Sequence, residues 1–165
     1  MEKVEMNKDM KLSELYGLRL SPHFTLGEMT KTNHKTADGN IPSRVVIENL
    51  RNLCENWLED LRYSYNTLYP DDKPIIITSG YRSPEVNRLA GGSATSNHLT
   101  GCAVDIRVTG FEQAIRYASI LLDISDGTKR DYDELFIERN KAGSHWIHFA
   151  VRPTGNRRKM DFLKV

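Results

Sequence analysis

The stretch SNHLTGCAVDI, residues 96–106, decides how the rest of the sequence is interpreted. Its second half alternates in character, as strands do, and the alternation puts Asp105 on the more polar side. His98 precedes this predicted strand by one loop, and Gly101 gives that loop the freedom to fold back. An imidazole and a carboxylate at this spacing are either an ordinary turn that enters a strand or part of a metal site.

A second segment, HWIHFAV at residues 145–151, supplies another imidazole. On a strand, Trp146 and His148 share one face, so pairing of the two strands would set His148 beside Asp105. Two imidazoles and one carboxylate suit zinc and leave a fourth position for water. The pKa of such a water falls to about 7, so a zinc-bound hydroxide nucleophile forms at neutral pH. Histidines close together on a strand also occur as plain surface residues, and that alternative stays open here.

Composition is typical of a soluble globular protein. The chain has 165 residues, enough for one domain, with 39% hydrophobic and 27% charged residues. The net charge is +1, from 23 basic and 22 acidic residues, so we expect no nucleic acid and no membrane as partner. We also expect a monomer. Cys54 and Cys102 are too few for a disulfide framework and lack CxxC spacing, so we expect two buried thiols.

The N-terminal residues 1–17 are charged and contain no apolar run. They are predicted to be a polar tail or a segment that adheres to the domain, and not a secretory signal or a membrane span. Residues 18–165 are predicted to form the domain. We expect synthesis in the cytoplasm, with access to the cell exterior only after lysis or by non-standard export.

The remaining elements predict an α+β domain with helices packed on a mostly antiparallel sheet. A long helix from residue 42 to before residue 69 carries an apolar stripe, and residues 74–80 form a buried strand. Ser83 caps a further helix. Strands are expected at DELFIE and HWIHFAV, and a basic segment with a short tail ends the chain. A second amphipathic helix is expected to face the core with Phe111, Ile115, Ala118 and Leu122, and a capping box to start a short helix at Thr25 and Glu28.

These segments resemble the M15 metallopeptidases, which comprise zinc D-alanyl-D-alanine carboxypeptidases and dipeptidases and phage L-alanyl-D-glutamate endolysins. The family pattern S-x-H-x-x-G-x-A-x-D is matched at every fixed position by residues 96–105, and its later W-x-H by residues 146–148. The resemblance is to the single-domain branch of the family found in phages and bacterial genomes. It covers roughly residues 20–158 and implies a hedgehog/DD-peptidase-like fold.

The resemblance implies a role for four side chains. His98, Asp105 and His148 correspond to the ligands of one Zn²⁺ per chain. Arg82, in SGYRS, corresponds to the arginine that contacts the scissile carbonyl, where a guanidinium can stabilise developing negative charge. Without the resemblance, a solvated arginine at a helix start would be the simpler interpretation.

One position departs from the common family pattern. Many relatives have Glu or Asp three residues before the last ligand, as general base, whereas this chain has His145. Histidine can transfer protons near neutral pH, but on a regular strand His145 and His148 face opposite ways, so His145 needs a loop or bulge. Glu138 is the alternative base and Asp133 a weaker one, and loss of activity is a further alternative.

Three more residues are candidates for substrate binding: Ser96, Tyr81 and Trp146. Ser96 would bind either the substrate or the loop backbone. Trp146 would line the cleft or pack, with packing favoured.

The expected function is hydrolysis of amide bonds next to a D-amino acid in peptidoglycan stem peptides. Two alternatives remain. One is a non-catalytic cell-wall binding module that keeps the metal site, and the other is a metallopeptidase whose substrate is a peptide that is not part of the cell wall. The sequence does not distinguish a carboxypeptidase from an endopeptidase. Absence of a signal peptide fits a phage or prophage endolysin released at lysis.

Overall fold

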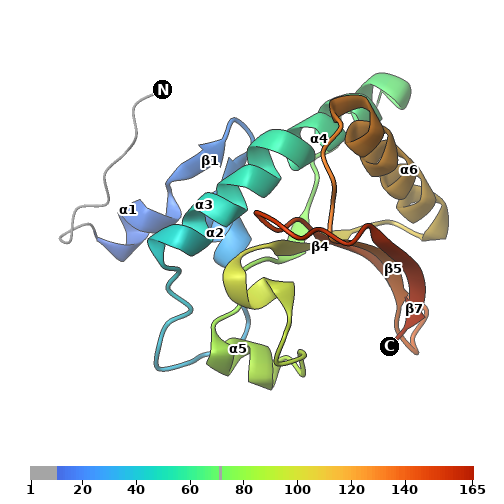
Figure 1. Cartoon of the computed structure of the whole chain (residues 1–165). Coiled ribbons are helices and arrows are strands. Elements are labelled where there is room, and N and C mark those ends of the chain that lie inside the picture. The colour runs from blue at the N-terminus through green and yellow to red at the C-terminus, as the bar shows by residue number, and fades with distance from the viewer. Residues whose placement is uncertain (1–10, 71) are drawn as a thin grey trace.

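The computed structural model describes residues 11–70 and 72–165. Its centre is a five-stranded sheet with the strand order β3-β4-β6-β5-β7 (Figure 1). Neighbouring strands in this sheet are antiparallel except β5 and β7, which run parallel. The predicted α+β architecture with a mostly antiparallel sheet is therefore confirmed. The strands are β3 (Ile77–Ser79), β4 (Ala103–Arg107), β5 (Glu134–Arg139), β6 (His145–Ala150) and β7 (Lys159–Lys164).

The sheet buries one face under helices and leaves the other more open. Helices α4 (Glu59–Leu68) and α6 (Phe111–Thr128) lie above the sheet in Figure 1, whereas α5 (Pro84–Leu89) lies below it. Ring packing joins the layers, because the ring centroids of Phe149 and Trp57 are 5.1 Å apart. The strand residues on the helix-covered face are apolar and buried: Val104, Ile106, Leu135, Ile147 and Phe149.

One long helical stretch covers this face. It consists of α3 (Arg44–Leu53), the π-helical turn η1 (Cys54–Leu58) and α4, with helical dihedral angles at both junctions. Its extent agrees with the helix predicted from the sequence. Ser43 caps its start, because the Ser43 Oγ accepts a hydrogen bond from the Val46 N–H at 3.3 Å.

The predicted caps of the two short helices are present. In α2 (Leu26–Thr30), the Glu28 N–H donates to the Thr25 Oγ1 at 3.3 Å and the Thr25 N–H donates to the Glu28 Oε2 at 2.8 Å, which is a capping box. In α5, the Val86 N–H donates to the Ser83 Oγ at 3.2 Å. Local hydrogen bonding of this kind is readable from sequence because both partners are near neighbours.

The N-terminal boundary differs from the prediction. Helix α1 (Leu12–Tyr16) lies within the predicted tail, and Leu15 belongs to the hydrophobic core with 7% exposure. The packed domain therefore begins before residue 18, as the adhering-segment alternative requires. Residues 1–10 lie outside the described range, so the tail prediction stays a prediction there.

Helix α6 is rotated relative to the predicted apolar face. Phe111 and Ile115 are 49% and 47% exposed, whereas Ala114, Tyr117 and Leu121 are buried. The predicted Ala118 is buried, and Tyr117 packs edge-on against Tyr65 of α4, with ring centroids 4.8 Å apart. The face predicted from helical spacing is therefore right at Ala118 and Leu122, which packs partly buried against the core, and wrong at Phe111 and Ile115.

Two strand pairs were not predicted. Strand β7 forms where a tail was expected, and its residues are mostly exposed, so no apolar run marks it. A small hairpin pairs β1 (Arg19–Ser21) with β2 (Phe24–Thr25). Both depend on a partner strand that short-range patterns do not specify.

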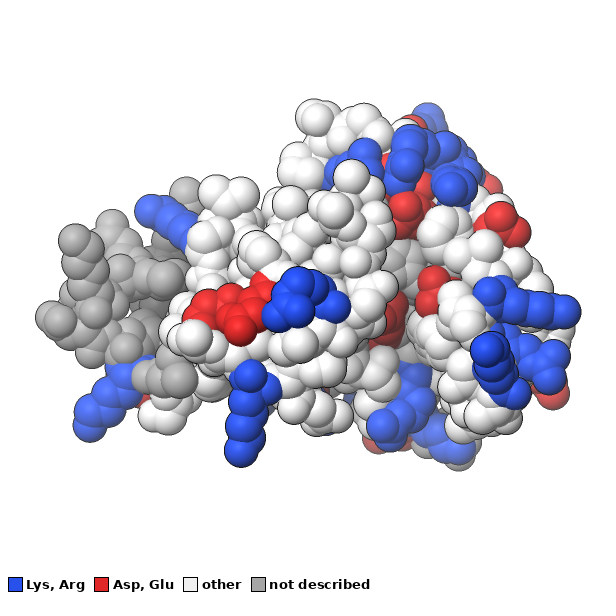
Figure 2. Space-filling view, turned by 90° about the horizontal axis from the view of Figure 1, so that it is seen from below, with Lys and Arg blue, Asp and Glu red and all other residues white. Residues whose placement is uncertain are grey.

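Surface and thiol features agree with the composition. Cys54 and Cys102 are both buried and unbridged. Among the described helices, none combines the length and the apolar character that crossing a membrane requires. Figure 2 views the molecule from below and shows basic and acidic side chains interspersed on that side, with neither sign forming one continuous patch.

Candidate metal centre

Three side chains, from the turn before β4, from β4 itself and from the distant strand β6, converge on the open face of the sheet. His98, Asp105 and His148 each offer one ligand atom, and these atoms lie within 4.8 Å of one another. The Asp105 Oδ1 is 3.4 Å from the His98 Nε2 and 3.2 Å from the His148 Nδ1. All three residues are at most 8% exposed, so the cluster is a buried polar group in need of a charge partner.

Strand register brings Asp105 and His148 together. In the antiparallel pair of β4 and β6, Asp105 lies directly opposite His148. The partner strand β5 places Phe136 opposite His148 on the other side, and the Phe136 ring stacks on the imidazole with centroids 5.4 Å apart. The alternation of the two strands therefore sends both polar side chains to the face that the helices leave open.

The loop before β4 returns His98 to the same place. His98 lies in the 3-10 helix η2 (Asn97–Thr100), which ends at Gly101 with φ 72°. A Cβ at Gly101 would lie 2.7 Å from the Val46 carbonyl oxygen, so close packing of this turn on α3 and its left-handed backbone both require glycine. Gly101 therefore allows both the left-handed turn that brings His98 back to the sheet and the close contact of that turn with α3.

Each imidazole is oriented by a hydrogen bond on its far side. The His98 Nδ1 is 2.6 Å from the Gly80 carbonyl oxygen, which only a donor can satisfy, so the His98 Nε2 faces the cluster without needing the proton. The His148 Nε2 is 2.8 Å from the Glu134 Oε2, and the His148 Nδ1 faces the cluster. Metal-binding histidines have such partners on the nitrogen that does not bind the metal.

The electrostatics of the cluster suit a cation. Burial acts to raise the pKa of Asp105, but the two imidazoles hold that pKa well below its ordinary range, so Asp105 is a carboxylate. Burial acts to lower the pKa of His148, yet the carboxylates of Asp105 and Glu134 raise it to about 9. Without metal, a proton on His148 balances Asp105; a divalent cation can take the place of that proton. The donor set and the charge therefore fit Zn²⁺.

Arg82 lies beside the cluster. Its Nη2 donates to the Asp105 Oδ2 at 3.0 Å and its Nε donates to the Ser79 Oγ at 2.9 Å. The side chain is 18% exposed, which does not describe a solvated arginine at a helix start. Arg82 is therefore a fixed guanidinium in direct contact with one of the three candidate ligands.

Of the three candidate bases, only Glu138 shares the open face near the cluster. Glu138 pairs directly with Trp146, two residues from His148 on β6. Burial raises the pKa of Glu138 above its ordinary value, and the negative charge of Asp105 raises it further. Asp133 is fully buried and accepts hydrogen bonds from Arg157.

His145 does not reach the cluster. It pairs with Arg139 at the start of a regular β6, with no bulge that would turn its side chain. Its ring lies 5.3 Å from that of Phe111, the first residue of α6, on the opposite face from His148. The condition under which His145 could act on the metal, a loop or bulge at this position, is therefore not met.

The three candidates for substrate binding have different environments in the structure. The Ser96 Oγ accepts a hydrogen bond from the His98 N–H at 3.2 Å, which favours the loop-backbone alternative. Tyr81 is 8% exposed and belongs to the hydrophobic core. Trp146 is on the open face beside Glu138, where it can line a cleft.

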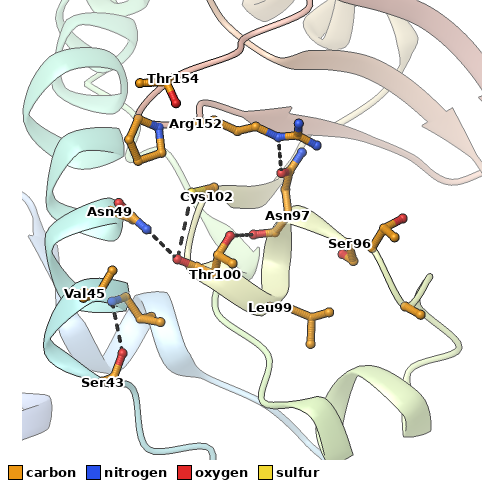
Figure 3. Close-up of a pocket in the computed structure, with 14 residues that line it drawn as sticks. Ser43, Val45, Asn49, Ser96, Asn97, Leu99, Thr100, Cys102, Arg152 and Thr154 are labelled. Carbon is orange, nitrogen blue, oxygen red and sulfur yellow. Dashed lines mark hydrogen bonds between the residues drawn. The ribbon is translucent and has the colours of Figure 1, made fainter.

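A surface pocket of about 620 Å³ lies next to the loop that carries His98 (Figure 3). Asn49 of α3 and Arg152 bound it on two sides, and Leu99 contributes an apolar wall. None of the three candidate ligands lines this pocket, so it is a neighbour of the metal centre and not its opening.

Three residues of the site were missed in the sequence: Glu134, Asn97 and Arg157. Glu134 was detectable, because the alternation that puts Glu138 on the open face puts Glu134 there too. Asn97 and Arg157 carry no comparable signal, since their contacts are made across 36 and 24 residues of chain.

Comparisons with known proteins bear on this geometry. A sequence model of the peptidase M15 family matches residues 22–132, a range that includes His98 and Asp105. The chain is also similar to the zinc D-Ala-D-Ala carboxypeptidase of Streptomyces albus G, with 29% identity over 85 residues. That alignment covers 51% of this chain and 31% of the carboxypeptidase, so this chain spans less than a third of the length of that relative.

Proposed function

Because the chain belongs to the peptidase M15 family, we propose that it is a zinc-dependent peptidase of peptidoglycan stem peptides, cutting an amide bond next to a D-amino acid. The observation that carries the proposal is the convergence of His98, Asp105 and His148 on an open face, beside a further carboxylate and a guanidinium. The name of the Streptomyces relative supports a D-alanine-containing substrate.

The ligand set leaves room for chemistry. Zinc held by two imidazoles and one carboxylate supplies Lewis acidity, which polarises a carbonyl and lowers the pKa of a water. Arg82 uses its Nε and Nη2 on Ser79 and Asp105, which fixes the guanidinium plane. Its remaining N–H groups can donate to the scissile carbonyl oxygen, where negative charge grows during attack.

Glu138 is the residue to which we assign proton transfer. It would take a proton from the attacking water and deliver it to the nitrogen of the leaving amine. Its carboxylate shares the face of His148, and its raised pKa brings it closer to neutral pH, which favours both halves of that transfer. The departure from the family pattern at residue 145 then needs no loss of activity, because a base is supplied from the neighbouring strand.

Mass spectrometry of muropeptides after incubation with the zinc-loaded protein tests the proposal. We expect loss of a terminal D-alanine or cleavage within the stem peptide, abolished by a chelator and restored by Zn²⁺. The same spectra identify the scissile bond and so distinguish a carboxypeptidase from an endopeptidase. Arg82→Lys serves as a matched variant, since it keeps the charge but loses the fixed fork of N–H groups and should lower kcat.

Two outcomes would contradict the proposal. A protein that carries zinc and binds peptidoglycan but releases nothing at any pH would be a wall-binding module. A protein that digests casein and leaves muropeptides intact would be a metallopeptidase with another substrate.

A further inference from the structure

The two ring nitrogens of His148 have different carboxylate partners. The Nδ1 is 3.2 Å from the Asp105 Oδ1 inside the cluster, whereas the Nε2 is 2.8 Å from the Glu134 Oε2 outside it. An imidazole binds a metal only through a nitrogen without a proton. An acceptor at Nε2 keeps the proton there and leaves the Nδ1 lone pair for the metal.

Glu134 is itself held at both oxygens. Its Oε1 accepts a hydrogen bond from the Arg157 Nη2 at 2.7 Å, and its Oε2 accepts one from the Asn97 Nδ2 at 3.1 Å. The side chain is 17% exposed and lies opposite Ala150, a residue too small to displace it. The carboxylate therefore cannot turn away from His148 without losing bonds on both sides.

A buried carboxylate organises the residues that hold Glu134. Asp133 has 0% side-chain exposure and accepts from the Asn97 Nδ2 at 2.8 Å and from the Arg157 Nη2 at 2.8 Å. The Arg152 Nε is 3.1 Å from the Asp133 Oδ2 and donates to the Asn97 Oδ1 at 2.9 Å, the contact drawn in Figure 3. Two arginines thus balance two adjacent carboxylates, which is how a protein keeps such a pair ionised in a buried place.

The network reaches both candidate imidazoles. Asn97 directly precedes His98 in η2, and Glu134 contacts His148 on β6. Because Asn97 donates to Asp133 and Glu134 together, a displacement of one histidine segment is felt by the other.

We propose that Glu134 is a positioning residue that directs the Nδ1 of His148 at the metal, and that Asp133, Asn97 and Arg157 keep Glu134 in that orientation. The inference rests on the proposed zinc site but on no assumption about the substrate. Glu134 has no role in proton transfer to substrate, since both of its oxygens are engaged.

Metal affinity tests this assignment independently of catalysis. We expect Glu134→Ala to weaken Zn²⁺ binding by about 10- to 100-fold in competition with a chromophoric chelator. Glu134→Gln keeps an acceptor oxygen of the same reach and should lose clearly less. Glu138→Ala is the matched control: it removes a carboxylate from the same face of the same strand but no partner of His148, and should lower Zn²⁺ affinity clearly less than Glu134→Ala does.

Two spectroscopic readouts separate positioning from general destabilisation. The Co²⁺-substituted Glu134→Ala protein should show a shifted d–d absorption spectrum, because the orientation of one ligand changes. In ¹⁵N spectra of the zinc-loaded wild type, the His148 Nε2 should carry a slowly exchanging proton, which Glu134→Ala exposes to rapid exchange.

The assignment would be overturned by Glu134→Ala protein with wild-type Zn²⁺ affinity and spectrum, or by an equal loss in Glu138→Ala. If Glu134→Ala does not fold, the same measurements are made on Glu134→Gln. A wild-type Co²⁺ spectrum combined with a proton on the His148 Nδ1 would contradict the assignment, because the metal would then be bound by the Nε2. A wild type that binds Zn²⁺ as expected but cuts no muropeptide would refute the proposed function and leave this inference standing.

Discussion

The two faces of the five-stranded sheet are made by the same strands but have different tasks. On β6, Ile147 and Phe149 are fully buried under the helices, while His148 between them points to the open face and the metal centre. The first face is apolar and contributes stability; the second gathers carboxylates and imidazoles that are costly to bury. Alternation along a strand thus lets one element serve packing and chemistry with neighbouring residues.

The largest expected effect is on the open face. In His98→Ala, one of three candidate ligands is lost. Zn²⁺ affinity should therefore fall by more than the roughly 100-fold expected when a residue that only hydrogen-bonds to a ligand is removed, and activity should fall with it. The metal-free variant should remain folded, because the helix-covered face is untouched. Native mass spectrometry with and without chelator measures bound zinc, and circular dichroism checks the fold. A variant that still holds one zinc per chain would show that the cluster is not the metal site.

A matched pair of variants tests which face supplies the base. Glu138→Gln should lower kcat by about 10²- to 10⁴-fold with zinc content unchanged, because it removes proton transfer alone. His145→Gln should change kcat by no more than about twofold, since its ring faces α6. Steady-state kinetics on a synthetic muropeptide gives both values. The reverse ranking would assign the catalytic base to His145, on the helix-covered face of the sheet, and would contradict the assignment to Glu138.

On the helix-covered face, a substitution should lower stability and leave zinc binding intact. Phe149→Ala removes a fully buried ring that packs on Trp57 and should cost about 3–5 kcal/mol of unfolding free energy. The fraction that remains folded should still bind zinc, because the ligands are on the other side. Urea denaturation of the metal-free protein measures the loss; a cost under about 1 kcal/mol would mean that the ring is dispensable to the core.

The smallest effect expected is a pH dependence of the metal-free protein. The pKa of His148 is raised from 6.5 to about 9, so the folded state holds this proton more tightly than the unfolded chain. The resulting stabilisation is complete below pH 6.5 and is lost as pH rises through 9, a change on the order of 1–3 kcal/mol. Thermal melts across this range check it, with His148→Gln as control. An identical slope in that variant would assign the dependence to another group.

Sequence patterns were sufficient where partners are local or where a motif is specific. The capping box at Thr25 and Glu28 and the cap at Ser83 were predicted because donor and acceptor are three residues apart. The α+β class followed from the periodicity of the long segments. The convergence of two histidines and an aspartate followed from strand alternation and the family pattern.

Patterns failed where distant contacts decide. Strand β7 is mostly exposed and exists because β5 pairs with it. On α6 the buried face includes Ala114, Tyr117 and Leu121 and leaves Phe111 and Ile115 exposed, and helix α1 packs through Leu15. Periodicity records amphipathic character but not which of two half-apolar faces finds a partner.

By itself, the sequence determined which side chains could hold a metal and which face of each strand they occupy, because both follow from residue type and the two-residue period of a strand. Only the tertiary structure decided that Glu138 and not His145 accompanies the cluster, and that Glu134, Asp133, Asn97 and Arg157 support it. Those contacts join segments far apart in the chain, and their geometry depends on strand register and loop placement, which no local pattern encodes.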